Sequence, residues 1–238
     1  MQSKYAEPSR HLRKLWLEWI ELHKMLDRGM KGELAAPFFS SVASHHPEDC
    51  VLLVGKATAG DYWLDSYRKS LRNSPEEAIR DRLMRNREFV SDGGNGRSFW
   101  RFFDRVAELR PDLGRDGVIW SNVAKIGSRT GNPTGLLLSA QGDLARRMLV
   151  AEVREYRPLL VVFVTANYAE KIINDAFGFT NDEVWENGPR GTPDDEVWWH
   201  RGSRDFPKVR FLWMRHPQGK TREQIDYWAR KAGELIIG

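Results

Sequence analysis

Four short apolar runs, separated by segments with helical patterning, limit most strongly the folds open to this chain of 238 residues. The runs cover residues 51–54, 117–125, 159–165 and 209–214. Each is nearly continuous in apolar side chains, which is typical of strands that are buried on both faces of a parallel sheet. Strands that alternate with helices favour an α/β fold. We therefore predict three α/β/α layers with a central four-stranded parallel sheet.

The remaining segments fit one domain that spans residues 1–238. Residues 1–49 are expected to supply an N-terminal helix and a loop. Residues 183–206 form a polar insertion punctuated by glycine and proline, and its two short apolar runs predict a hairpin. Ser74 and Thr221 each precede a segment with helical spacing, so their hydroxyls are expected to cap helix N-termini.

The composition excludes several classes of protein and cofactor. A single cysteine, Cys50, rules out internal disulfides, Cys-ligated iron–sulfur clusters and zinc fingers. No cluster of His, Asp and Glu has metal-ligand spacing, so we expect neither a metal nor another cofactor. No apolar run is long enough for a membrane span, and the first residues lack the apolar core of a signal peptide. We expect a monomeric, cytoplasmic protein, and its net charge of +4 and ten tryptophans are compatible with a nucleic-acid partner.

The first apolar run ends in a turn of small residues, GKATAG, at residues 55–60. Little side-chain bulk in such a turn lets a ligand lie directly against the backbone. Open α/β sheets bind their ligands just past the carboxyl ends of the strands. The turn therefore predicts a substrate-binding segment that contains Lys56, Ala57, Thr58, Ala59 and Gly60.

Unusual polar residues also occur at the ends of later strands. Asn122 lies inside the second apolar run, where an amide without hydrogen-bond partners would cost about 1–3 kcal/mol. His216 directly follows the fourth run. We expect these two side chains, although distant in the sequence, to converge on one cavity that is wide enough for a nucleobase.

Taken in order, the strand ends carry GKATAG, SNVAK followed by RTGNPT, TANY, and RHPQG. This set resembles the uracil-DNA glycosylase superfamily over about residues 51–220. The middle segment is similar to the family's NVVK and GNR-P motifs, here at residues 122–125 and 131–133. The last is similar to its His-Pro-Ser motif, here His216-Pro217-Gln218. The resemblance implies a glycosylase-like fold, and the single cysteine implies a divergent member without an iron–sulfur cluster.

The resemblance also implies an activity on DNA, in which a pyrimidine is flipped out and its N-glycosidic bond is hydrolysed to leave an abasic site. A donor aimed at the departing base typically lowers the barrier by about 3–4 kcal/mol. By resemblance, His216 has this role at the pyrimidine O2, and Asn122 reads the Watson–Crick edge. Candidates to stack on the base are Tyr62, Trp63 and Phe99. Those expected to contact DNA are Lys125, Arg129, Asn132, Gln218 and Lys220.

The first turn departs from the family pattern. Uracil-excising members commonly place a carboxylate or amide there to hold the attacking water, whereas this chain has Lys56 and Ala57. Asp61, which we take as the catalytic carboxylate, or Asp65 could supply the missing group. No bulky residue stands beside Ala59 and Gly60 to block substituents at C5 of the base.

An open pocket favours a 5-substituted or glucosylated hydroxymethylcytosine, as in phage DNA, and hence a role in phage defence. Two alternatives within the same fold are a uracil-DNA glycosylase of base-excision repair and a non-catalytic DNA-binding module. A third alternative is an unrelated α/β nucleotide hydrolase, although the turn lacks the Gly-Lys-Ser/Thr ending of a P-loop.

Overall fold

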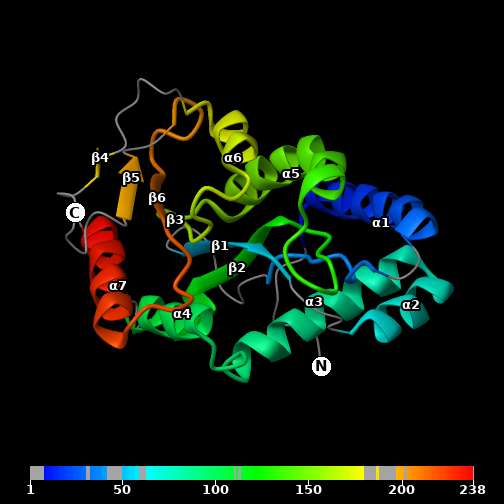
Figure 1. The fold of residues 1–238 in the computed structure, drawn as a ribbon, viewed down its shortest axis with the longest axis horizontal. Coiled ribbons are helices and arrows are strands. Elements are labelled where there is room, and N and C mark those ends of the chain that lie inside the picture. The colour runs from blue at the N-terminus through cyan, green and yellow to red at the C-terminus, as the bar shows by residue number, and fades with distance from the viewer. Residues whose placement is uncertain are drawn as a thin grey trace.

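The computed structural model describes residues 8–30, 33–41, 50–58, 63–109, 111, 114–179, 186–187, 197–200 and 203–237. Four strands pair in parallel in the order β2-β1-β3-β6, which confirms the predicted α/β class and four-stranded parallel sheet. Their bounds are β1 Val51–Ala57, β2 Val118–Ala124, β3 Leu160–Phe163 and β6 Arg210–Met214. The parallel pairing brings the carboxyl ends of all four strands to the same edge (Figure 1).

The predicted insertion contributes two more strands to this sheet. Strand β4 (Glu186–Asn187) pairs antiparallel with β5 (Val197–His200), as expected of a hairpin. Strand β5 in turn pairs antiparallel with β6, so the insertion extends the central sheet, which the sequence pattern did not indicate. The side chains of this insertion between residues 183 and 202 lie outside the described part of the chain.

Seven α-helices occur in the described residues, and none of these has the length and apolar character needed to cross a bilayer. Ser74 Oγ accepts a hydrogen bond from the Glu77 N–H at 3.0 Å, and Thr221 and Gln224 form a reciprocal pair of 3.1 and 3.3 Å. Both predicted caps are therefore confirmed. The helices are α1 Arg10–Met30, α2 Leu64–Asn73, α3 Pro75–Ser91, α4 Ser98–Glu108, α5 Gly135–Tyr156, α6 Glu170–Phe177 and α7 Arg222–Ile237.

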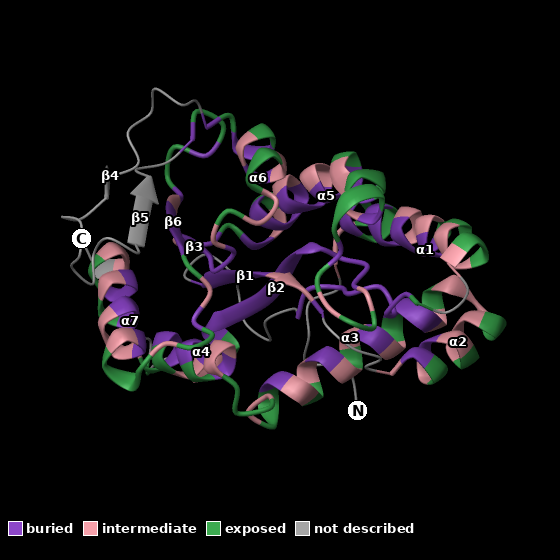
Figure 2. Cartoon of the chain, in the orientation of Figure 1, coloured by how far each residue is buried: buried purple, intermediate pink, exposed green. Residues whose placement is uncertain are grey.

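Alternate residues of the buried strands pack against helices on opposite faces of the sheet. Leu52 and Val54 belong to an apolar cluster with α1, α5 and α6, whereas Val51 and Leu53 belong to a second cluster with α4 and α7. Figure 2 shows the strands buried between these helices, whose exposed residues face outward. The continuous apolar character of the four runs follows from this two-sided burial.

Lys125, at the end of β2, is fully buried and forms an ion pair with Glu152 of α5. Its Nζ lies 2.6 Å from Glu152 Oε1 and also 2.6 Å from Ser121 Oγ, which donates to the other Glu152 oxygen. The prediction that Lys125 contacts DNA is therefore wrong, because its charge is neutralised inside the protein. The charged amine is stable in the protein interior because a carboxylate and a hydroxyl replace its hydration shell.

Candidate functional site

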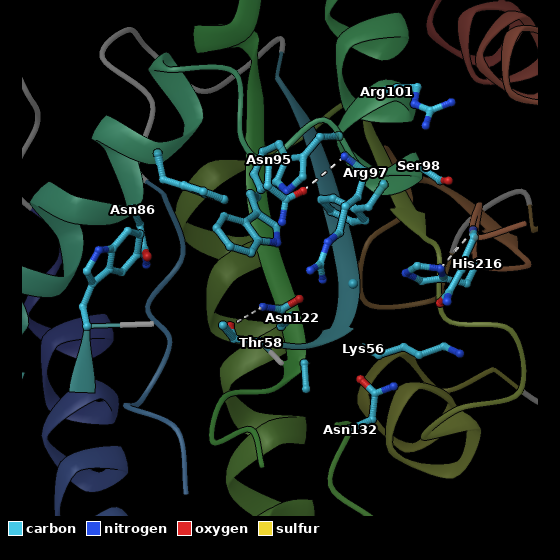
Figure 3. A pocket seen from close by; sticks show the side chains of 18 residues that line it. Lys56, Thr58, Asn86, Asn95, Arg97, Ser98, Arg101, Asn122, Asn132 and His216 are labelled. Carbon is cyan, nitrogen blue, oxygen red and sulfur yellow. Dashed lines mark hydrogen bonds between the residues drawn. The ribbon is translucent and has the colours of Figure 1, made fainter. Parts of the chain in front are cut away.

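A cavity of about 480 Å³ lies at the carboxyl ends of the parallel strands (Figure 3). It is lined by the end of β1, by the inner part of β2, by α3 and the start of α4, and by the loop after β6. Both Asn122 and His216 line it. The structure thus brings together the two residues that the sequence analysis expected to converge.

Asn122 is held by β1 and by Thr58, the residue that directly follows this strand. It is 2% exposed, and its Nδ2 donates a hydrogen bond to Thr58 Oγ1 at 3.2 Å. Gly55 is its direct partner across the two strands, and a Cβ atom added to Gly55 would lie 2.6 Å from Asn122 Oδ1. The glycine is therefore required because the Asn122 amide occupies the space that any larger residue would fill.

Replacing Gly55 with alanine is expected to push the Asn122 amide away from Thr58. Overpacking of this kind typically costs about 1–3 kcal/mol of unfolding free energy. We expect a value at the lower end, because the short Asn122 side chain can rotate away. Urea denaturation measures the cost, and a crystal structure of the variant would show the displaced amide. An unmoved Asn122 in that structure would contradict this account of Gly55.

His216 is positioned by a tight turn. The Lys220 N–H donates to the Pro217 carbonyl, and Gly219 adopts a positive φ of 77°. This turn directs the Gln218 N–H to His216 Nδ1 at 3.2 Å. Because Nδ1 accepts a hydrogen bond, the proton of the neutral ring is on Nε2. Burial, reinforced by the charge of Lys56, lowers the pKa of His216 to about 4. At neutral pH this residue is an uncharged donor.

Lys56, at the end of β1, brings a positive charge into the cavity. Burial lowers the pKa of its amine. Neither a hydrogen bond nor an ion pair links this amine to another described residue, and no Asp or Glu occurs among the described residues of the lining. The cavity is therefore electropositive and suited to negative charge on a ligand.

Aromatic side chains form one wall of the cavity. Phe99 stacks on His216 with ring centroids 6.4 Å apart and an interplanar angle of 23°. Phe89 contacts Trp63 and Trp100 edge to face, at 5.7 and 5.0 Å. Such faces suit a flat, aromatic ligand. The residues of this wall are Trp63, Phe89, Phe99, Trp100 and Trp120.

Asn86 of α3 was missed by the sequence analysis. Its Nδ2 donates to the Phe39 carbonyl, whereas its Oδ1 is buried without a partner in the described structure. Figure 3 places Asn86 and His216 on opposite sides of Asn122. The helical spacing could have revealed this residue. Asn86 lies two helical turns after Ile79 and one turn before Val90, which places it on the buried face of α3.

The other predicted residues divide into three groups. Lys56, Ala57, Thr58, Phe99, Asn132 and Gln218 line the cavity. Arg129, Lys220 and Asp65 do not, and Lys220 instead lies over the Trp228 ring at 5.6 Å. Ala59, Gly60, Asp61 and Tyr62 fall outside the described residues.

The start of α4 adds basic groups and a helix N-terminus to the lining, through Arg97, Ser98 and Arg101. This combination attracts anions.

The chain matches no protein-family model, and no curated protein shows significant similarity to it. The described residues contain no group of three or more His, Cys, Asp or Glu that could hold a metal ion. The cavity does provide an amide, a neutral imidazole, an amine and an aromatic wall. These groups can bind a flat polar ring and stabilise negative charge that develops on it.

Proposed function

We propose that this protein is a DNA glycosylase with a uracil-DNA glycosylase-like fold, which excises a flipped pyrimidine and leaves an abasic site. The supporting observation is that Asn122 and His216 line one cavity at the carboxyl ends of the strands. A pyrimidine offers mixed donors and acceptors to an amide, and a carbonyl oxygen to an imidazole N–H. The aromatic wall supplies the stacking surface that such a ring requires.

In the proposed reaction, the bond between the sugar and the base breaks through an oxocarbenium-like state. The electron pair of that bond leaves with the pyrimidine, and the resulting negative charge falls largely on its O2. The neutral His216 donates a hydrogen bond to this oxygen through Nε2, while the nearby Lys56 charge favours the same anion. Water then adds to the sugar cation. Activation of this water by Asp61 remains a prediction from the sequence.

The DNA strand would be held by the basic groups at the cavity rim. Arg97 and Arg101 are exposed residues at the start of α4, where the first backbone N–H groups lack intrahelical partners. Together they form a site for a phosphate beside the flipped nucleotide. This arrangement replaces the phosphate contact that the sequence analysis assigned to the buried Lys125.

The favoured substrate is a 5-substituted or glucosylated hydroxymethylcytosine. A volume of 480 Å³ falls within the range of about 300–1,000 Å³ that holds drug-sized ligands, which are larger than a single pyrimidine ring. Asn86 Oδ1 is a buried acceptor, without a partner among the described residues, at the side of the cavity away from His216. Asn86 is 0% exposed, so a hydroxyl group on the base substituent would satisfy this oxygen once the Asn86 side chain turns toward the ligand. Such bases occur in phage DNA, which suggests a defence role.

A panel of duplexes tests the proposed function. Each carries one uracil, thymine mismatch, cytosine, 5-methylcytosine, 5-hydroxymethylcytosine or glucosylated hydroxymethylcytosine, and alkali-labile strand breaks report excision. We expect the hydroxylated cytosines to react fastest. Faster reaction of uracil would support the repair alternative. Tight binding of DNA without breaks in any duplex would support a non-catalytic module and overturn the glycosylase proposal.

Replacing Asn86 with leucine should reduce discrimination between 5-hydroxymethylcytosine and 5-methylcytosine. A lost hydrogen bond to a neutral group costs about 0.5–1.5 kcal/mol, so we expect the ratio of the two kcat/KM values to fall roughly 2- to 13-fold. Both substrates are measured with the same variant, which cancels any loss of folded protein. Asn174→Leu is the matched control, because its Oδ1 also has no partner in the described part of the chain but lies outside this cavity. An unchanged ratio in Asn86→Leu would remove Asn86 from substrate recognition.

A further inference from the structure

We propose that Lys56 gives this protein a second activity, cleavage of the DNA strand at an abasic site through a covalent imine with the sugar aldehyde. This lyase step goes beyond base excision and would act on its product. It rests on the proposed function for the origin of the abasic site and for the position of the sugar in the cavity. The inference comes from the position of Lys56 and from the absence of a partner for its amine within the described structure.

The amine lies close to where the reacting sugar carbon would be. Lys56 and His216 line the same cavity, and Figure 3 shows both on the same side of Asn122. In the proposed complex His216 contacts O2 of the pyrimidine, which is separated from the sugar C1′ by only the ring atoms C2 and N1. The charge of Lys56 also contributes to the lowered pKa of His216, in agreement with their shared place in the lining. The lyase proposal therefore places the Lys56 amine at C1′ in this complex.

The state of the amine also suits a nucleophile. A lysine forms an imine only when it is deprotonated, and burial favours that form by lowering the pKa of Lys56. A carboxylate beside it would oppose this effect, but the described lining contains none. The buried Lys125 provides a contrast within the same chain, because its ammonium is paired with Glu152 and has no access to a ligand.

The chemistry balances without any further reactant except water. The Lys56 amine adds to the C1′ aldehyde of the ring-opened sugar, and one water leaves to form the imine. A proton then passes from C2′ to solvent, its electron pair forms the C2′–C3′ double bond, and the C3′–O bond breaks to release the phosphate. Water finally hydrolyses the imine, which frees Lys56 and leaves an unsaturated aldehyde on the 3′ end.

The test uses a duplex with a preformed abasic site, so the identity of the excised base is irrelevant. We expect the wild-type protein to nick this duplex with a 3′ unsaturated aldehyde as the product. Added cyanoborohydride should reduce the imine and leave a covalent protein–DNA adduct, whose tryptic peptide maps to Lys56. Lys56→Arg keeps the positive charge but should lose both the adduct and the nick. Lys171→Arg, an exposed lysine on α6, should retain both.

Three outcomes would overturn the lyase proposal. They are an adduct that maps to another amine, nicking that persists in Lys56→Arg, and no adduct with wild-type protein that binds the abasic duplex. Thermal melting and abasic-duplex affinity of Lys56→Arg show whether that variant is folded, and Lys56→Gln serves as a second variant if it is not. Excision of a base without strand cleavage would refute the lyase and leave the glycosylase standing. Nicking of the abasic duplex without excision of any base would refute the glycosylase and leave the lyase standing.

Discussion

Replacing His216 with alanine is expected to lower the single-turnover rate of base excision by about 10²–10³-fold, which is the typical effect of removing one donor to a developing anion. The residue is specified by three independent contacts, namely the Gln218 N–H on Nδ1, the Phe99 ring stacked beside it, and the Lys56 charge. The hydrogen bond on Nδ1 and the Lys56 charge favour a neutral ring with its proton on Nε2, and the Phe99 ring packs against one face of the imidazole. The loss should appear in the chemical step, while the affinity for DNA changes little.

The matched control is His11→Ala, which removes an exposed imidazole from α1 and should leave the rate unchanged. Single-turnover rates with excess protein, together with equilibrium binding to the same duplex, separate the two effects. A His216→Ala protein that excises the base at the wild-type rate would eliminate this residue as the donor. A loss of affinity with an unchanged rate at saturating protein would instead indicate a role in binding only.

The same assignment predicts an unusual pH dependence. A histidine in water has a pKa near 6.5, whereas burial and Lys56 lower the pKa of His216 to about 4. Its neutral form therefore persists as the pH falls from 7 to 5, and protonation of Nδ1 breaks the bond from the Gln218 N–H only near pH 4. We expect no inflection of the excision rate at pH 6.5 and a fall near pH 4 that His216→Ala lacks. A wild-type inflection at pH 6.5 would contradict a half-buried imidazole that stays neutral at pH 5.

The elements that sequence analysis predicted best are those that a local pattern specifies. Four continuous apolar runs indicated strands buried on both faces, and Ser74 and Thr221 marked helix starts through hydroxyls that act within one turn. Asn122 was detectable because an amide inside an apolar run needs a partner. That partner, Thr58, and the space made by Gly55 follow from strand register, which the local pattern does not show.

The features that the sequence analysis assigned wrongly or did not predict have a common physical origin, because they depend on contacts between distant segments. Lys125 reads as an ordinary surface cation until Glu152, one helix later, is placed against it. The hairpin strands were predicted, but their pairing with β6 depends on which sheet edge is available. Asn86 lies in a helix rich in arginine, where a polar residue attracts no notice until the helix is packed over the cavity.

The buried Lys125–Glu152 pair gives the largest expected effect on stability. Replacing Glu152 with alanine leaves the Lys125 ammonium without a counter-charge in the protein interior. Removing one partner of such a pair typically costs about 3–5 kcal/mol. For a chain of this size each kcal/mol lowers Tm by roughly 2–4 °C, so we expect a fall of roughly 6–20 °C in a thermal melt. Asp143→Ala, which removes an exposed partner of Arg146 and Arg147, should cost about 1 kcal/mol or less.

A double replacement distinguishes the cost of an unpaired charge from the value of the pair itself. Lys125→Met combined with Glu152→Leu removes both charges while keeping most of the side-chain volume, and such exchanges are often neutral or stabilising. We expect this protein to recover most of the Tm lost in Glu152→Ala. Ser121, which directly precedes Asn122, keeps its bond with Lys125 in Glu152→Ala but loses both partners in the double variant. We therefore expect the excision rate of the double variant to stay below the wild-type rate even where its Tm recovers. Full recovery of both the Tm and the excision rate would show that the Lys125–Glu152 pair does not help to position Asn122.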